Sequence, residues 1–296
     1  MQRRSFLRNS ALCAVAVSAS GFIRFDGKTY TGDCATTTDI IGPYYRPNAP
    51  VRTNLLVPGV TGDVVELSGI IKHKDCSTPL KGACVEIWHC DGKGVYDNDS
   101  DEFRYRGKTY CDANGKYSFR TALPIPYDVG NGNTRPAHYH LLISAAGYQE
   151  LVTQIYFTGD PHLSEDSSSS SPAAKTRILE KQKIANGELG VVFNVTMMDN
   201  LPADPAAIDM LSGTYITTDG KKAKHEFFKR DGLLWQKDDT PTGGDPFYYK
   251  GNNTFTMYGD DVSIKFEPQA DGTTKATASW KNKDGKMQET TALKQK

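Results

Sequence analysis

The sequence lacks an excess of charge of either sign, because 35 Lys and Arg residues balance 35 Asp and Glu residues among 296. This balance argues against a nucleic-acid-binding surface and against a polybasic membrane patch. The chain also lacks a run of apolar residues long enough to cross a bilayer near its start. Its N-terminal apolar stretch, residues 11–19, is too short and too weakly apolar for that.

The N-terminus instead has the pattern of a targeting segment, predicted over residues 1–29. Arg3 and Arg4 are followed by Phe6-Leu7 and the apolar stretch, and Val17-Ser18-Ala19 offers a small-residue cleavage site. The paired arginines resemble a twin-arginine export signal. We therefore expect an exported protein, periplasmic or extracellular. An ordinary secretory signal and an uncleaved anchor are the alternatives.

Cysteines are few, and none forms a Cys-x-x-Cys pair, which makes a structural zinc knuckle improbable. Once Cys13 is set aside with the targeting segment, an odd number remains. An oxidising compartment would permit one or two disulfides and leave at least one thiol free. The pairing is left open among Cys34, Cys76, Cys84, Cys90 and Cys111.

Long helical patterns are also rare, and short apolar runs bounded by Gly, Asn and Pro predict an all-β chain. The first part, residues 30–201, has the strand spacing of an antiparallel β-sandwich. Its predicted strands are Val64–Lys72, Ala83–His89, Lys116–Thr121, His138–Ala145, Glu150–Phe157 and Gly190–Met197. A short helix with a solvated face is expected over residues 176–186, because Arg177, Glu180, Lys181 and Lys183 give it mixed charge.

A second region begins after the Pro202-Ala203-Asp204-Pro205 stretch, which indicates a domain boundary. Residues 210–296 contain short alternating strands separated by Asp-Gly turns, typical of an antiparallel meander or a small barrel. The strands are predicted at 225–229, 233–236, 247–250, 254–258, 262–266, 274–280 and 287–293. No cluster of metal-ligating residues occurs there, so its role stays open.

The most informative stretch is Arg135-Pro136-Ala137-His138-Tyr139-His140, at the head of a predicted strand. Strand alternation puts both imidazoles on one face and Tyr139 on the other. Two neutral imidazoles on one face can bind one metal ion, although such pairs also occur as polar strand faces. No Asp or Glu follows at the spacing of a ferrous site with two histidines and one carboxylate.

Four motifs in order resemble the intradiol ring-cleavage dioxygenases, the catechol and protocatechuate dioxygenases. They are Val85-Glu86-Ile87-Trp88-His89-Cys90-Asp91 with Gly94-Val95-Tyr96, then Leu123-Pro124-Ile125-Pro126-Tyr127, the histidine stretch, and Thr153-Gln154-Ile155-Tyr156-Phe157-Thr158-Gly159-Asp160. The resemblance covers roughly residues 36–200. The chain departs from the family at Ile125, where a glycine is usual before the last proline.

This resemblance implies a non-haem Fe(III) ion held by Tyr96, Tyr127, His138 and His140. Two phenolates suit the ferric state, because hard anionic oxygens favour it over the ferrous one. For the first tyrosine ligand, Tyr105 and Tyr110 are the rivals of Tyr96, since they lie in the same region.

The resemblance also implies roles in catalysis and substrate binding. Arg135 would stabilise negative charge on the substrate ring, Tyr127 would accept a substrate proton, and Gln154 would face the same pocket. Tyr44 would line the substrate cavity. For Arg135 the alternative is a surface ion pair.

The implied reaction joins a small aromatic diol with O2, cleaves the ring between its hydroxyl-bearing carbons and gives a cis,cis-muconate. Which diol is used stays open, and so does the oligomeric state. Two other readings are an exported relative that binds a different metal, and a non-catalytic β-sandwich binding module. Neither nucleic acid nor a stable membrane span is expected.

Overall fold

The computed structural model describes residues 34–296 except 60–61, 131, 240–241, 258–261, 283–285 and 296. It also describes the backbone of three short N-terminal strands, β1 Val17–Ser18, β2 Gly21–Phe25 and β3 Tyr30–Gly32, paired in that order. The rest of the predicted export signal at residues 1–29, including Cys13, lies outside the described residues. Export therefore stays a prediction.

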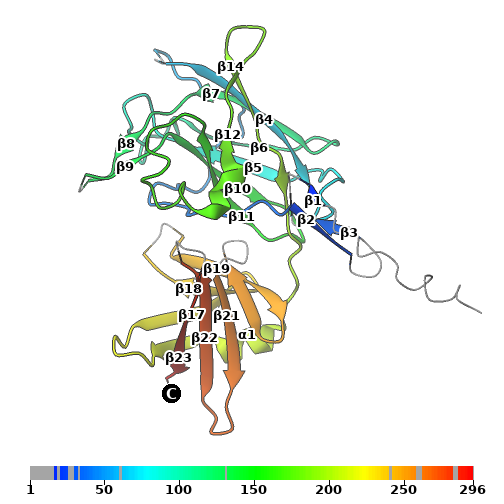
Figure 1. Ribbon diagram of the computed structural model, residues 1–296, viewed down its shortest axis with the longest axis vertical. Coiled ribbons are helices and arrows are strands. Elements are labelled where there is room, and N and C mark those ends of the chain that lie inside the picture. Colours follow the sequence, from blue (N-terminus) through cyan, green and yellow to red (C-terminus); the bar gives the residue numbers. More distant parts are fainter. Residues whose placement is uncertain are drawn as a thin grey trace, which may run out of the picture.

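The chain forms two β-rich lobes, one above the other in Figure 1, with the C-terminal lobe below. The upper lobe is a sandwich of two five-stranded sheets, and the lower lobe is a closed eight-stranded barrel. The predicted all-β class is confirmed. Within the described part of the chain, no helix is both long and apolar enough to cross a membrane.

The sheet that carries the histidines has the strand order β12-β11-β10-β5-β6. These strands are Ile178–Leu179, Leu151–Phe157, His138–Ser144, Cys84–Trp88 and Arg106–Tyr110. The opposite sheet has the order β13-β14-β4-β15, with β7 paired to β4. Its strands are Gln182–Lys183, Leu189–Val192, Val64–Lys72, Val195–Thr196 and Lys116–Ala122. Most pairs are antiparallel, but β14 and β15 run parallel to β4, and β12 runs parallel to β11.

The sandwich core forms because alternate side chains of each strand point between the sheets. Tyr139, Leu141 and Ile143 of β10 face inward and pack with Leu67 of β4 and Phe119 of β7, all fully buried. His138 and His140 therefore face the other way. The candidate site lies on the outer face of this sheet, away from the main core.

One predicted strand, Gly190–Met197, is interrupted between β14 and β15. At the interruption the Phe193 carbonyl passes so close to Gly69 that a Cβ there would lie 1.8 Å from the carbonyl oxygen. Tyr117 donates its hydroxyl to the same oxygen at 2.8 Å. Because this carbonyl bonds to a side chain, the regular ladder stops for two residues. Strand β6 was not predicted.

The helix expected over residues 176–186 is wrong. Residues Pro172–Arg177 form a short 3-10 helix, η1, and the chain then continues as β12 and β13. Arg177 points into the protein, where it makes an ion pair with Asp39, instead of standing on a solvated face. The buried partner and the pairing of β12 with β11 override the local helical pattern.

The C-terminal lobe begins with helix α1, Pro205–Leu211, whose first turn is capped by Asp204. Its barrel closes through pairing of β16 with β23. The strands β16 to β23 are Gly213–Thr217, Lys224–Arg230, Leu233–Lys237, Gly244–Gly251, Thr254–Met257, Val262–Pro268, Thr274–Lys281 and Met287–Lys294. All seven predicted strands occur, whereas α1 and β16 were not predicted.

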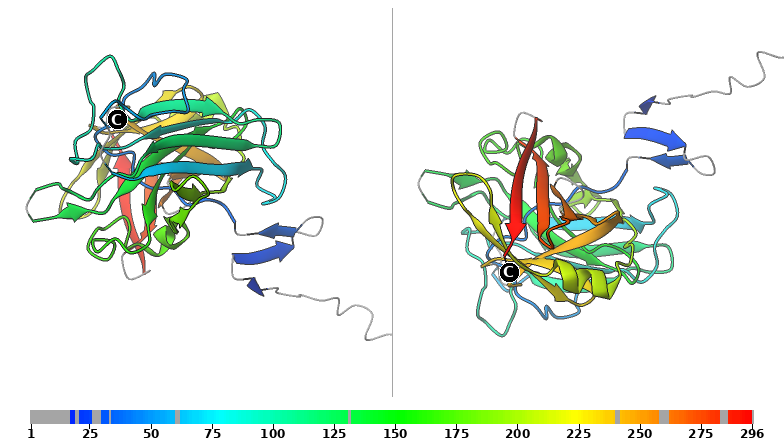
Figure 2. Two further views of the ribbon diagram at one scale, coloured as in Figure 1. Left: turned by 90° about the horizontal axis from the view of Figure 1, so that it is seen from above. Right: turned by 90° about the horizontal axis from the view of Figure 1, so that it is seen from below.

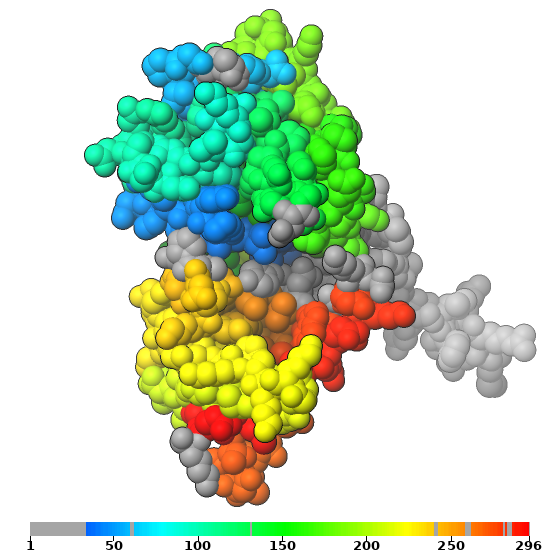
Figure 3. Space-filling model, turned by 90° about the vertical axis from the view of Figure 1, so that its left-hand side faces the viewer, coloured from blue at the N-terminus to red at the C-terminus, as the bar shows by residue number. Residues whose placement is uncertain are grey.

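The two lobes meet closely, as the space-filling view in Figure 3 shows. Tyr248 of β19 reaches the edge of the sandwich, where its hydroxyl accepts a hydrogen bond from the Glu150 amide at 2.9 Å and lies 3.3 Å from the Glu150 carbonyl oxygen. Leu201 forms a bridge with Tyr249. These contacts link the loop before β11 to the barrel wall.

One disulfide, Cys34–Cys76, joins the N-terminal segment to the loop after β4. Cys84, Cys90 and Cys111 are free thiols, and the last two are buried. The pairing was not derivable from spacing, because the partners are 42 residues apart and meet only through the fold.

Candidate metal centre and active site

The two histidines of β10 converge as strand alternation predicts. His138 Nε2 lies 3.2 Å from His140 Nε2, and both rings are buried. His138 Nδ1 lies 2.6 Å from the Pro136 carbonyl oxygen, so Nδ1 carries the hydrogen and Nε2 keeps its lone pair. Burial, reinforced by the Arg135 charge, lowers the pKa of His138 to about 3. Burial and the neighbouring His138 also hold the pKa of His140 well below its ordinary value, so both rings are neutral.

Tyr96 joins the pair from the loop after β5, with its hydroxyl 3.3 Å from His138 Nε2. Asp91 shapes this loop by accepting hydrogen bonds from the amides of Lys93 and Val95. At Gly94 the backbone has φ of 80° and a Cβ would lie 2.7 Å from Tyr127 Cβ, so only glycine fits. This close approach brings the two tyrosine segments together.

Tyr127 lies in β8, Tyr127–Asp128, which pairs with β9, Thr134–Arg135. Its ring centroid lies 5.7 Å from that of Tyr96 and 5.6 Å from that of His138. The short β8–β9 hairpin therefore sets Tyr127 beside the head of β10. The four residues predicted as metal ligands come from three separate segments and meet at one place.

The two phenols differ in how their surroundings affect ionisation. Burial raises the pKa of both. A hydrogen bond from Tyr96 and the charge of Arg135 partly oppose the rise for Tyr127. For Tyr96 the contact with Tyr127 raises the pKa further. Of the pair, Tyr127 is thus the phenol that its neighbours favour as the anion.

These residues fit a metal ion by the chemistry of their donors. The Tyr96 hydroxyl and His140 Nε2 both lie within 3.3 Å of His138 Nε2. A cation would hold both nitrogens and promote loss of the phenol protons, since ligation needs the anion. In the described ranges, no three His, Cys, Asp or Glu side chains come together as a metal site, so tyrosine oxygens would have to complete the set.

His140 has two further features that bear on the site. Its ring stacks on the Trp88 indole with centroids 4.9 Å apart and planes 8° apart, which fixes the ring orientation. Its Nδ1 atom and Trp88 Nε1 are both buried without a hydrogen-bond partner among the described residues. Because buried polar atoms normally have partners, these two point to a site that is completed by something other than protein.

The rival tyrosines do not join the cluster. Tyr105 is buried against the ring of His89, and Tyr110 is 56% exposed. His89 itself bonds to Thr121 and to the Cys90 carbonyl. The structure thus places Tyr96, and not its rivals, beside the histidines.

Tyr44 and Tyr45 lie next to the cluster. The Tyr44 ring stacks on Tyr96 with centroids 4.4 Å apart, where it can line the approach to the site. Tyr45 packs against Trp88 at 5.1 Å and serves as a packing aromatic.

Arg135 is largely buried and is not a surface ion-pair residue. Its Nε donates to Asp166 at 2.9 Å, and its Nη2 donates to Gln154 Oε1 at 2.8 Å. Gln154 in turn donates to the Ile40 carbonyl at 2.7 Å. The guanidinium is therefore fixed beside Tyr127 and His138, whose pKa values respond to its charge.

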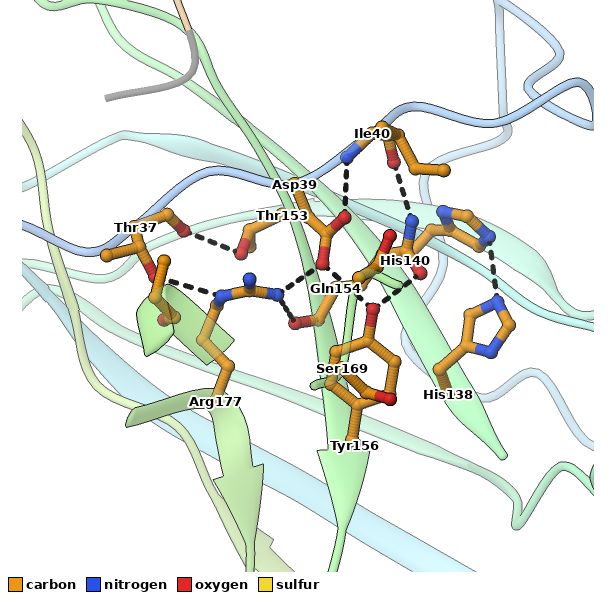
Figure 4. A network of polar contacts seen from close by, with 12 residues as sticks. Thr37, Asp39, Ile40, His138, His140, Thr153, Gln154, Tyr156, Ser169 and Arg177 are labelled. Carbon is orange, nitrogen blue, oxygen red and sulfur yellow. Dashed lines mark hydrogen bonds and ion pairs between the residues drawn. The ribbon is translucent and has the colours of Figure 1, made fainter. Parts of the chain in front are cut away.

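A second buried arginine supports this arrangement from behind (Figure 4). Arg177 donates to Asp39 at 2.5 Å and to the Gln154 carbonyl at 2.7 Å. Tyr156 donates to the same Asp39 carboxylate at 2.8 Å and lies 3.2 Å from Gln154 Oε1. Sequence reasoning missed Asp39 and Arg177, because no local spacing links residues 138 positions apart.

Comparison with known proteins identifies the family to which the N-terminal lobe is related. The family described as Dioxygenase matches residues 40–199. A chlorocatechol 1,2-dioxygenase of Rhodococcus opacus is 30% identical over 59% of this chain and 77% of its own length. A catechol 1,2-dioxygenase of Candida albicans is 36% identical over 45% of this chain and 50% of its own length. Among solved structures, a catechol 1,2-dioxygenase of Acinetobacter sp. ADP1 superposes with a TM-score of 0.51, at 26% identity over 56% of this chain and 64% of that one.

The chain belongs to the intradiol ring-cleavage dioxygenase family. It spans about three quarters of the first relative and half of the second. The match ends before α1, so the C-terminal barrel lies outside the part that the family covers.

Proposed function

We propose that this protein is a non-haem Fe(III) enzyme that cleaves a catechol-type diol between its two hydroxyl-bearing carbons with O2. The product would be a cis,cis-muconate. The observation that carries the proposal is the meeting of Tyr96, Tyr127, His138 and His140, in which the Tyr96 hydroxyl and His140 Nε2 both lie within 3.3 Å of His138 Nε2. Family membership supplies the reaction class.

A bound ferric ion would supply Lewis-acidic activation of the substrate diol. Tyr96, His138 and His140 would hold this ion with fixed geometry, because each is buried and their rings are braced by Tyr44, Pro136 and Trp88. The neutral state of both imidazoles suits that role.

Tyr127 would take one substrate proton on its phenolate oxygen. Its pKa is raised by burial, while the Tyr96 hydrogen bond and the Arg135 charge moderate the rise. The raised pKa lets the phenolate take up a proton, and the two opposing effects keep the anion accessible before the substrate arrives. The pKa of Tyr96 is raised further by its contact with Tyr127, so Tyr96 would depend on the metal to hold it as the anion and would stay a ligand.

Arg135 would stabilise the negative charge that develops on the substrate ring. Asp166 and Gln154 hold the guanidinium by two hydrogen bonds, so it needs no rearrangement during the reaction. Gln154 is thereby a positioning residue, since its Oε1 contacts Arg135 and its Nε2 is held by the Ile40 carbonyl.

Colour, iron content and oxygen uptake test the proposal together. Tyrosinate-to-Fe(III) charge transfer should make the purified protein red-brown, and catechol should drive oxygen uptake. His138→Ala or His140→Ala should remove colour, iron and turnover together. His162→Ala is the matched control, because His162 lies outside the cluster and contacts Glu165. Stoichiometric iron and full activity in either cluster variant would refute the ligand set.

We also propose that the protein is exported by a twin-arginine route, on the basis of Arg3-Arg4 and the apolar stretch that follows. Replacing both arginines with lysine should leave the precursor in the cytoplasm, as seen by fractionation. Export of the Lys-Lys form at the normal level would point to the general secretory route instead.

A further inference from the structure

The C-terminal barrel is filled at one end and hollow at the other. At the filled end, large aromatic side chains interlock edge to face. Tyr215 and Phe227 lie 5.4 Å apart, and Phe227 lies 5.9 Å from Phe247. Helix α1 adds Ile208 and Leu211 to this cluster, and the Tyr215 hydroxyl donates to the Leu211 carbonyl at 2.9 Å. That end is closed by packing.

Small side chains occupy inward positions in the other half. Ala276 and Ala278 of β22 pair with Ala292 and Thr290 of β23, and alternation places all four on the inner face. Small barrels normally fill their interior with side chains. Here the small residues leave a cavity of about 480 Å³, within the size range of ligand sites. The right-hand view of Figure 2 shows the barrel strands from below.

Exposure of the lining residues shows where the cavity opens. Tyr215 and Ala276 are buried, His225 is half-buried, and Asp219 and Ala223 at the β16–β17 turn are exposed. The turn is well formed, because the Thr217 hydroxyl donates to Asp219 at 2.6 Å and accepts from the Ala223 amide at 2.8 Å. The cavity therefore has a structured mouth at this end.

Two polar side chains interrupt the apolar wall. Gln236 Nε2 donates to His225 Nδ1 at 3.2 Å, so the imidazole hydrogen is on Nε2. His225 Nε2, a donor, and Gln236 Oε1, an acceptor, are the remaining polar atoms of this pair. Trp280 contributes a flat ring to the same wall. A hydroxyl on an aromatic ligand matches such a pair, because it can both accept and donate.

The charged residues around the cavity indicate which ligand charge it can accept. The two acidic residues among the lining residues are Asp219 and Glu289, and no Lys or Arg lines the described cavity. A carboxylate buried in this cavity would therefore have no cation among the lining residues to pair with, so an uncharged ligand is favoured. This criterion selects against carboxylates.

We propose that the barrel cavity is a second ligand site, separate from the candidate metal centre, that binds a small uncharged aromatic molecule bearing a hydroxyl group. The aromatic ring contacts Trp280 and the alanine-lined wall, and the hydroxyl meets His225 and Gln236. This inference does not depend on the proposed reaction, since none of its residues belongs to the family-matched region.

Titration calorimetry of the full chain with 2-naphthol tests the site. Saturable binding is expected, and 2-naphthoate should bind at least about tenfold more weakly, because of its charge. Ala278→Phe fills the cavity and should weaken 2-naphthol binding by about tenfold or more. Thr277→Phe is the matched control, since its side chain points outward on the same strand, and it should bind like the native chain.

Two further variants keep the result interpretable. Gln236→Leu keeps the volume but removes the polar partner, so it should weaken 2-naphthol while leaving naphthalene binding unchanged, even if Ala278→Phe fails to fold. His138→Ala should bind 2-naphthol normally, which separates this site from the metal centre. The proposal is overturned if the native chain shows no saturable binding up to the solubility limit. It is also overturned if folded Ala278→Phe and Gln236→Leu both bind 2-naphthol like the native chain, or if His138→Ala abolishes binding.

Discussion

The Glu86 carboxylate lies on the outer face of β5 and is only 8% exposed. It is two residues from Trp88 and therefore on the same face of the strand. Burial raises its pKa from 4.5 to about 7, although Lys108 and Arg106 partly oppose the rise. The native state therefore keeps a proton that the unfolded chain has already released. The contribution of protonated Glu86 to the free energy of unfolding is fully present below about pH 4.5. It is lost as pH rises through about 7.

Glu86→Gln should remove this loss, because an amide cannot ionise. At pH 8 the variant should be more stable than the native chain by up to about 3 kcal/mol, whereas at pH 4.5 the two should be similar. Urea unfolding at both pH values measures the difference. Glu66→Gln, on an exposed position of β4, is the control and should change stability little at either pH. Equal effects of Glu86→Gln at the two pH values would contradict the prediction.

At the residue scale, sequence reasoning found groups that stand in compact motifs and missed those that do not. His138, His140, Tyr127 and Arg135 lie within one short stretch, so strand alternation and a family resemblance predict their meeting. Asp39 is brought to Arg177 only by the folded sheet. Its role in holding Arg177, which bonds to the Gln154 carbonyl, could not be seen in any local pattern.

Among elements, the segment from η1 to β13 shows why a charge pattern can mislead. Mixed charges over residues 176–186 are typical of an exposed helix, but Arg177 is 1% exposed and bonds to Asp39, Thr37 and the Gln154 carbonyl. Strong buried partners determine the local conformation there. By contrast, β10 and most barrel strands have clear alternation, and their bounds were predictable within a few residues.

Breaking the Arg177–Asp39 ion pair should be costly. Arg177→Met leaves a buried carboxylate without its charge partner, so we expect a loss of about 3–5 kcal/mol in unfolding free energy. Turnover should also fall, since Gln154 loses a hydrogen bond behind Arg135. Urea unfolding and oxygen uptake measure the two effects.

Two variants serve as controls for this prediction. The double change Arg177→Met with Asp39→Leu should recover part of the stability, because no unpaired charge remains. Arg104→Met breaks the exposed pair with Glu102 and should change stability little. If Arg177→Met were as mild as Arg104→Met, the buried pair would not support the fold.

For the whole molecule, the division of the chain into two lobes predicts that the N-terminal lobe can fold without the C-terminal barrel. The proposed ligands all lie between residues 96 and 140, and the family match ends at residue 199. A chain shortened to end at Leu201 should fold, bind iron and cleave catechol. It should be less stable, because the Tyr248 contacts with Glu150 are lost.

Tyr248→Phe in the full chain is the matched control, since it removes only the hydroxyl and should cost about 1 kcal/mol. Iron content, melting temperature and turnover are compared across the three proteins. A shortened chain that is soluble and loaded with iron yet inactive would show that the barrel contributes to catalysis.

The alternation of β10 has a consequence for how such enzymes diversify. Tyr139, Leu141 and Ile143 belong to the core, whereas His138 and His140 face the site, so the two sets of positions are independent within one strand. Substitutions at Leu142, which lies on the same face as the histidines and packs against the cluster around Tyr96, can alter the lining of the site without disturbing the packing that keeps the sheet folded. Selection on substrate range and selection on stability therefore act on different residues. Substrate range can change in evolution while the fold is retained.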